Sequence, residues 1–125
     1  RGASVVAKCE VTALRFHSDG LRLAAATSTG HCLLYDLRSS RPLLVKSHQY
    51  GLPITDVKFH EATRNVLSLD RKVLKVWDQD SGDNAFNIEP MADAVDLTVV
   101  QDSGLLFMAG EQQRAMAYFV PDLGR

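Results

Sequence analysis

The sequence predicts an all-β fold, a partial β-propeller of about three four-stranded blades, because one strand pattern occurs three times. The similar segments lie at 11–30, 54–70 and 94–110. Their alternating residues correspond, at offsets of 43 and then 40 positions, as Thr12, Leu14 and Phe16, then Thr55, Val57 and Phe59, then Val95, Leu97 and Val99. Each segment leads into an aromatic tripeptide, namely Leu34-Tyr35-Asp36, Val76-Trp77-Asp78 and Ala117-Tyr118-Phe119. A period of roughly 40–45 residues built from short strands is typical of four-stranded propeller blades.

The first repeat, approximately 11–48, contains four expected strands. These strands are 11–16, 21–26, 31–36 and 42–45. In the first strand, alternation places Thr12, Leu14 and Phe16 on one face. The second strand is apolar on both faces, which is typical of a strand between two neighbouring sheets. Pro42 begins the outer strand, where a residue without a backbone N–H is tolerated.

The second and third repeats, approximately 49–90 and 91–121, follow the same order. Their expected strands are 54–59, 65–69, 73–77 and 85–88, then 94–100, 104–109 and 115–120. Residues 2–8 are interpreted as the last strand of a preceding blade. A propeller closes its ring with four to eight blades, so we expect residues 1–125 to be one propeller fragment of a longer protein.

Composition favours a reduced intracellular protein without a membrane segment. The chain has a formal charge of −1, 46% hydrophobic residues and two cysteines, Cys9 and Cys32. A charge near zero predicts no strong global attraction to nucleic acid or to anionic membranes. Two distant cysteines are expected to be reduced packing residues in a cytosolic or nuclear protein. No apolar run of about 18 residues is present.

The second repeat carries a polar pattern that resembles the WD repeat. The pattern consists of His48 before the first strand, Ser68 in the second, Asp70 at the next turn and Trp77-Asp78 ending the third. The resemblance implies a buried hydrogen-bond chain through these side chains, because an unpaired buried polar group costs about 1–3 kcal/mol. The first repeat has Tyr35 in place of tryptophan, and the third ends in Tyr118-Phe119.

Longer stretches resemble the nucleolar protein 10 family, also called essential nuclear protein 2. They are LLYDLRSSRPLLVKSHQYGLPI at 33–54, NIEP at 87–90, DSGLLFMAGEQ at 102–112 and Val120-Pro121-Asp122-Leu123-Gly124. The resemblance implies a nucleolar, nuclear scaffold of the small-subunit processome that is needed for maturation of 18S-type ribosomal RNA. It also implies other ribosome-assembly factors as partners, with pre-ribosomal RNA or snoRNP contact as a further expectation.

Four residues are candidates for contacts with protein or RNA. Arg38, Arg41 and Lys46 form a basic cluster along the outer edge of the first repeat, suited to RNA phosphates or to a solvated edge. Tyr50 lies in a loop that we expect on one rim, where it either anchors a partner or covers its own blade. As an alternative function, Asp36-Leu37-Arg38 resembles the box by which some WD-repeat proteins dock on a cullin-type ubiquitin ligase.

Catalytic and ligand-binding hypotheses find little support in the sequence. The acidic loop from Asp78 to Glu89 lacks the glycine that an EF-hand turn needs at its sixth position, where Asp83 stands. His17 and His60 occupy equivalent sites one repeat apart and are not expected to converge on one metal ion. No nucleophile elbow or phosphate-binding glycine loop occurs. We therefore expect no enzyme activity, metal, cofactor, small-molecule substrate or membrane contact.

Overall fold

A computed structural model describes residues 9–101, 103–110 and 115–121, and every strand in them belongs to one of three antiparallel sheets. We call these sheets the first, second and third blades. Their strands are β1 (Val11–Phe16), β2 (Arg22–Thr27), β3 (His31–Asp36) and β4 (Pro42–Ser47), then β5 (Asp56–His60), β6 (Asn65–Leu69), β7 (Leu74–Asp78) and β8 (Asn84–Ile88), then β9 (Ala94–Val100), β10 (Leu105–Gly110) and β11 (Ala115–Phe119).

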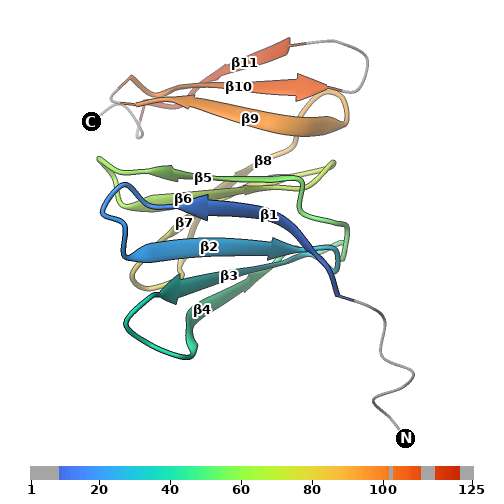
Figure 1. Cartoon of the computed structure of the whole chain (residues 1–125). Helices are drawn as coiled ribbons and strands as arrows, with labels where there is room; N and C mark the ends of the chain where they lie inside the picture. The colour runs from blue at the N-terminus through green and yellow to red at the C-terminus, as the bar shows by residue number, and fades with distance from the viewer. Residues whose placement is uncertain (1–8, 102, 111–114, 122–125) are drawn as a thin grey trace, which may run out of the picture.

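The three blades stack face to face in chain order (Figure 1). Within each blade the strands follow one another by antiparallel hairpins, so that neighbours in sequence are neighbours in the sheet. The first strands of successive blades lie side by side, β1 against β5 and β5 against β9. This arrangement of meandering sheets around a common inner edge is that of a partial β-propeller, and it confirms the predicted fold class.

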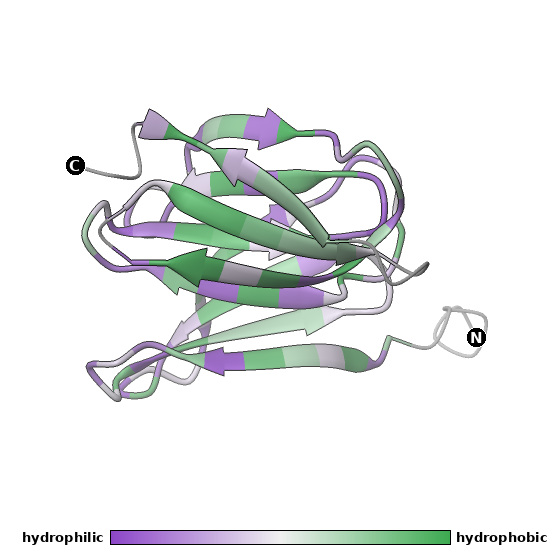
Figure 2. Ribbon diagram, turned by 90° about the horizontal axis from the view of Figure 1, so that it is seen from above, coloured by the Kyte–Doolittle hydropathy of each residue, from purple (hydrophilic) through white to green (hydrophobic). Residues whose placement is uncertain are grey.

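The second blade is covered on both faces, so the residues of β5 and β6 are mostly buried on both sides of the sheet. Figure 2 shows apolar residues along the strands of the stacked sheets. One buried cluster, between the first and second blades, contains Ala24, Ala26, Cys32, Leu34, Ile54, Val57, Phe59, Val66 and Trp77. The other, between the second and third blades, contains Leu67, Leu69, Leu74, Val76, Ala94, Leu97, Leu106, Met108 and Met116.

The face of the first strand differs from the prediction at Thr12. Leu14 and Phe16 share the exposed face of the first blade, at 61% and 58% exposure. A register shift between Val11 and Ala13 turns Thr12 the other way, and its hydroxyl donates to the carbonyl of Ile54 in the second blade. Strict alternation fails there because a bulge inserts one extra residue into the ladder.

The predicted strands agree with the structure to within two residues, and the largest shifts, of two residues, are the end of β4 at Ser47 and the start of β5 at Asp56. Residues 2–8, interpreted above as a strand of a preceding blade, lie outside the described residues. The repeat limits 11–48, 49–90 and 91–121 stay predictions. No helix in the described part of the chain is long and apolar enough to cross a membrane.

Candidate functional site

The four residues of the predicted polar chain meet in the second blade. Trp77 on β7 donates from Nε1 to Ser68 Oγ on β6, at 3.1 Å. Ser68 Oγ lies 2.8 Å from His48 Nε2, and His48 Nδ1 lies 2.9 Å from Asp70 Oδ2. All four residues are buried. The chain therefore connects two strands, the turn that follows β6 and the loop that precedes β5.

The two ends of this chain have fixed roles, because the indole N–H of Trp77 only donates and an ionised carboxylate only accepts. With a neutral His48, Trp77 donates to Ser68, Ser68 donates to His48 Nε2, and His48 donates from Nδ1 to Asp70. Burial lowers the pKa of His48, against the smaller raising effect of the Asp70 hydrogen bond and charge, and this direction favours the neutral form.

Asp70 also holds the turn between β6 and β7. Its Oδ1 accepts hydrogen bonds from the backbone N–H groups of Lys72 at 2.7 Å and Val73 at 2.8 Å. In the first blade, Thr27 has a similar but smaller role, since its Oγ1 accepts from the N–H of His31 at 3.2 Å. The corresponding turn of the third blade falls at 111–114, outside the described residues.

The structure divides the predicted basic cluster instead of gathering it into one surface. Arg38 turns back to Asp36, with Nε 2.9 Å from Oδ1 and Nη2 2.7 Å from Oδ2. Lys46 donates from Nζ to the carbonyl of Gly82 in the second blade, at 2.8 Å. Arg41 is exposed in the turn between β3 and β4. The three cations thus have three different environments.

The Asp36-Leu37-Arg38 segment is a self-contained turn. Besides the paired guanidinium, the backbone N–H of Arg38 donates to Asp36 Oδ1 at 2.9 Å. Arg38 lowers the pKa of Asp36 well below its usual range through these hydrogen bonds. Docking on a ubiquitin ligase through this segment stays a prediction. Loss of an adaptor protein from a pull-down with Arg38→Ala would support it.

Tyr50 lies beside an open hollow on one rim. The hollow has a volume of about 530 Å³ and is lined by Tyr50, Leu52, Lys72, Glu89 and Pro90. Tyr50 is 55% exposed, so its ring is free to contact another molecule. Lys72 on the wall pairs with Asp93 at 2.7 Å. The hollow therefore combines an exposed aromatic side chain with both signs of charge.

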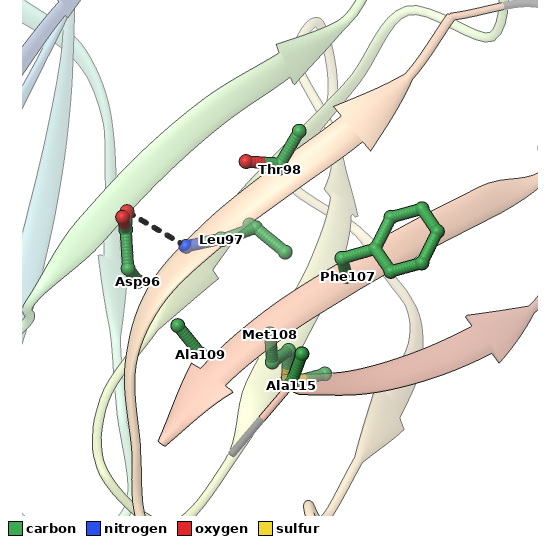
Figure 3. A pocket seen from close by; sticks show the side chains of 7 residues that line it. All are labelled: Asp96, Leu97, Thr98, Phe107, Met108, Ala109 and Ala115. Carbon is green, nitrogen blue, oxygen red and sulfur yellow. Dashed lines mark hydrogen bonds between the residues drawn. The ribbon is translucent and has the colours of Figure 1, made fainter. Parts of the chain in front are cut away.

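A second, smaller hollow of about 80 Å³ lies on the outward face of the third blade. Its lining consists of Asp96, Leu97, Thr98, Phe107, Met108, Ala109 and Ala115 (Figure 3). Asp96 Oδ1 accepts from the N–H of Leu97 at 2.9 Å (Figure 3). Small-molecule sites usually measure about 300–1,000 Å³, so this hollow is too small for a typical ligand.

The acidic loop after β7 uses its carboxylates locally. Asp78 Oδ1 accepts from the N–H groups of Asp80 and Ser81, at 2.8 and 2.9 Å. Asp80 pairs with Arg64 at 2.7 Å and with Arg22 at 3.3 Å. Among the described residues, no group of three histidine, cysteine, aspartate or glutamate side chains is placed to hold a metal ion.

Sequence reasoning missed a set of side-chain hydrogen bonds that join neighbouring blades. From the first blade, Arg15 Nε donates to the carbonyl of Val57 at 3.2 Å, and Ser18 donates to Glu61 at 2.7 Å. From the third blade, Gln101 Nε2 donates to the carbonyl of Phe59 at 3.0 Å. Each partner lies about one repeat away in sequence.

Asp56 makes the most buried of these connections. Its Oδ2 accepts from the N–H of Leu97 in the third blade at 2.9 Å, and its Oδ1 accepts from the N–H of Val57 at 2.8 Å. Burial raises the pKa of Asp56, and the neighbouring carboxyl of Asp96 raises it further. A sequence signal existed, because Asp56 and Asp96 occupy the same position of successive repeats.

Stacked antiparallel sheets of four, four and three described strands and a buried tryptophan–serine–histidine–aspartate chain define the class of this protein, a WD-repeat β-propeller. Comparison with solved structures supports the fold. The RRP9 WD40 repeats superpose with a TM-score of 0.81 at 14% identity, covering 94% of this chain and 38% of that one. The β-propeller domain of Cps50 (Swd1) gives a TM-score of 0.80 at 18% identity, over 89% of this chain and 36% of that one.

The chain belongs to the family described as Nucleolar protein 10-like, N-terminal domain, which matches residues 2–125. Nucleolar protein 10 of Xenopus tropicalis is 47% identical over 114 residues, or 91% of this chain. Ribosome biogenesis protein ENP2 of Chaetomium thermophilum is 43% identical over 119 residues, or 92% of this chain. The chain spans 16% and 18% of the lengths of these relatives. The family resemblance seen in the sequence is confirmed.

Proposed function

We propose that this chain belongs to a non-catalytic WD-repeat scaffold of ribosome biogenesis, which acts in the nucleolus in assembly of the small-subunit processome and maturation of 18S-type ribosomal RNA. Family membership carries the proposal. The relatives are named nucleolar protein 10 and ribosome biogenesis protein ENP2. Ribosome biogenesis and a nucleolar location follow from these names, while the processome step is the finer part of the proposal.

The described structure supports a binding role over a chemical one. The buried polar groups of the second blade are used to hold turns and strands together, since His48, Ser68, Asp70 and Trp77 bond mainly to one another. Exposed features lie instead on rims and edges, where rigid strands keep loops at fixed positions. Such loops are the usual place for binding residues on a rigid framework.

The rim hollow beside Tyr50 is the surface that we assign to a protein partner, another ribosome-assembly factor. Tyrosine is enriched where partners bind, because its ring buries a large area and its hydroxyl keeps a polar contact. Tyr50→Ala should weaken co-purification of assembly factors with the full-length protein. Leu37→Ala is a matched control, since Leu37 is 52% exposed in the turn after β3.

Depletion of the full-length protein tests the proposed function. Maturation of the small-subunit ribosomal RNA should fail, while the large-subunit RNA serves as an internal control on the same blot. Restoring the wild-type protein should restore maturation. Normal small-subunit RNA levels in depleted cells would contradict the proposal.

A further inference from the structure

Two lysines lie at the seam between the first and second blades, Lys46 on β4 and Lys75 on β7. Leu44 and Lys46 alternate on the face of β4 that looks toward the second blade. Leu44 packs against the buried cluster between these blades, and Lys46 Nζ reaches the carbonyl of Gly82 at 2.8 Å. β4 and the turn between β7 and β8 approach closely here, because a Cβ at Gly82 would lie 3.3 Å from Leu44 Cδ2.

Lys75 enters the same seam from the second blade. It lies two residues before Trp77 on β7, and Trp77 is buried in the cluster shared with the first blade. Residues two apart on a strand point to the same face, so Lys75 also faces the first blade. In the register of β7 and β8, Lys75 is opposite Asn87, which is exposed. Lys75 and Asn87 are therefore neighbours on this face of the second blade, and Lys46 is near enough for its charge to act on the pKa of Lys75.

These two positive charges lack an acidic partner. Within the part of the chain that the structure describes, neither Lys46 nor Lys75 forms an ion pair, whereas Lys72 pairs with Asp93 and Lys58 with Asp56. Desolvation lowers the pKa of Lys75, and the charge of Lys46 lowers it further. Asp70 acts in the opposite direction more weakly, and its oxygens are already bound by His48, Lys72 and Val73.

We propose that Lys46 and Lys75, with the amide of Asn87, bind the phosphate backbone of RNA at the seam between the first two blades. Lys46 gives one of its three donors to Gly82, so two remain for phosphate oxygens. Bound phosphate would supply the counter-charge that the lysines lack. Both lysines are half-buried and stay within reach of solvent.

The chemistry of the seam favours RNA over an acidic protein segment. Lysines act as point charges toward phosphate and need no particular sequence. A protein partner usually needs an apolar or aromatic anchor at the centre of its contact, and Lys46, Lys75 and Asn87 provide none. The inference rests on the proposed function in one respect, that nucleolar assembly exposes this protein to RNA.

Salt-dependent binding tests the site directly. Fluorescence anisotropy of a labelled single-stranded RNA is measured with the full-length protein and its Lys46→Gln/Lys75→Gln variant over a series of KCl concentrations. Each phosphate contact contributes a slope of roughly 0.7 in the logarithm of affinity against the logarithm of salt. We expect the double variant to lower the slope by roughly 0.7 to 1.4, for one or two phosphates.

Two variants separate the site from general effects. Lys46→Arg/Lys75→Arg keeps both charges and should retain the wild-type slope. Arg41→Gln removes an exposed cation of the same blade that lies outside the seam, and it should leave the slope unchanged. Thermal unfolding of each variant shows whether the glutamine pair has altered the fold.

Three outcomes would overturn the proposal. The first is an unchanged slope in a folded glutamine double variant. The second is an equal loss with Arg41→Gln, which would indicate unspecific attraction. The third is lysine-dependent binding of a poly-glutamate peptide without lysine-dependent RNA binding, which would assign the seam to an acidic protein. None of these results bears on ribosomal RNA maturation in depleted cells, so the scaffold proposal is tested separately.

Discussion

The first and second blades have the same four-strand plan but different surroundings. Both faces of the second blade are covered by neighbours, and Leu67, Leu74, Val76 and Trp77 are fully buried. Within the described residues, the second blade covers one face of the first blade, and the other face exposes Val11, Leu14, Phe16, Leu43 and Val45. The second blade alone, among the described residues, contains the complete polar chain.

The comparison shows how many donors the buried side chain at this turn has to satisfy. In the second blade, Asp70 is 0% exposed and accepts from His48 and from two backbone N–H groups. In the first blade, the equivalent Thr27 accepts from one backbone N–H group, that of His31. Four predictions test this difference, from the largest expected effect to the smallest.

Trp77→Ala should cause the largest loss of stability. Trp77 is 0% exposed and lies in the cluster between the first two blades, so its removal leaves a cavity and unpairs Ser68 on one side. We expect a decrease of about 3–5 kcal/mol in the free energy of unfolding, measured by urea titration. Tyr35→Ala, the half-buried equivalent in the first blade, should cost clearly less. Equal losses would contradict the comparison.

Asp70→Ala should be next, at about 3 kcal/mol. The substitution leaves three donors without an acceptor, from His48, Lys72 and Val73. Thr27→Val in the first blade removes a hydroxyl that accepts from one backbone N–H, so we expect about 1 kcal/mol there. Urea titrations of both variants give the two values, and a larger effect at Thr27 would refute the account of the two turns.

Gly30→Ala should cost about 2 kcal/mol. Gly30 has a φ of +87°, and an added Cβ would lie 3.1 Å from both Gly51 Cα and Leu52 O, so the turn after β2 would collide with the loop before β5. Gly20→Ala is the control, because Gly20 has a similar φ of +72° but open space around it. Thermal unfolding should show a larger destabilisation for Gly30→Ala than for Gly20→Ala. Equal destabilisation would mean that the positive φ, and not the contact with Gly51 and Leu52, causes the loss.

Acidification should weaken the second blade through His48. Its pKa in the folded protein is lowered from 6.5, so below that pH the unfolded chain binds more protons than the native one. The stability from neutral His48 is full above about pH 6.5 and falls as the pH decreases, by at most about 1.4 kcal/mol per pH unit. Urea titrations between pH 7 and 5 should show that the free energy of unfolding depends less on pH in His48→Gln than in the wild type. An unchanged pH dependence in that variant would exclude His48 as the cause.

The sequence predicted the strands and the polar chain well because both depend on local pattern. Alternating apolar residues recur at a fixed period. The four residues His48, Ser68, Asp70 and Trp77 match a repeat pattern in which the hairpins of one blade bring these positions together. The predictions at Thr12 and at the basic cluster fared less well. A bulge reorients Thr12, and composition could not show that Arg38 turns to Asp36 while Lys46 turns to the next blade.

Contacts between blades were the least predictable feature. Arg15, Asp56 and Gln101 form hydrogen bonds with backbone groups of a neighbouring sheet. Because nearly every residue type carries the same backbone groups, the sequence does not indicate which of them will be the partner. The repeated aspartate at positions 56 and 96 was a usable signal. Its significance became clear only from the side-by-side placement of β5 and β9.

The inter-blade hydrogen bonds of Arg15, Asp56 and Gln101 also affect the spacing at which neighbouring sheets can contact a partner. Because side chains of one sheet are bonded to the main chain of the next, neighbouring sheets should move as one rigid body. Two partner segments that touch adjacent sheets are then held at a constant separation. A change in the spacing of those segments would then weaken binding even if every individual contact were preserved.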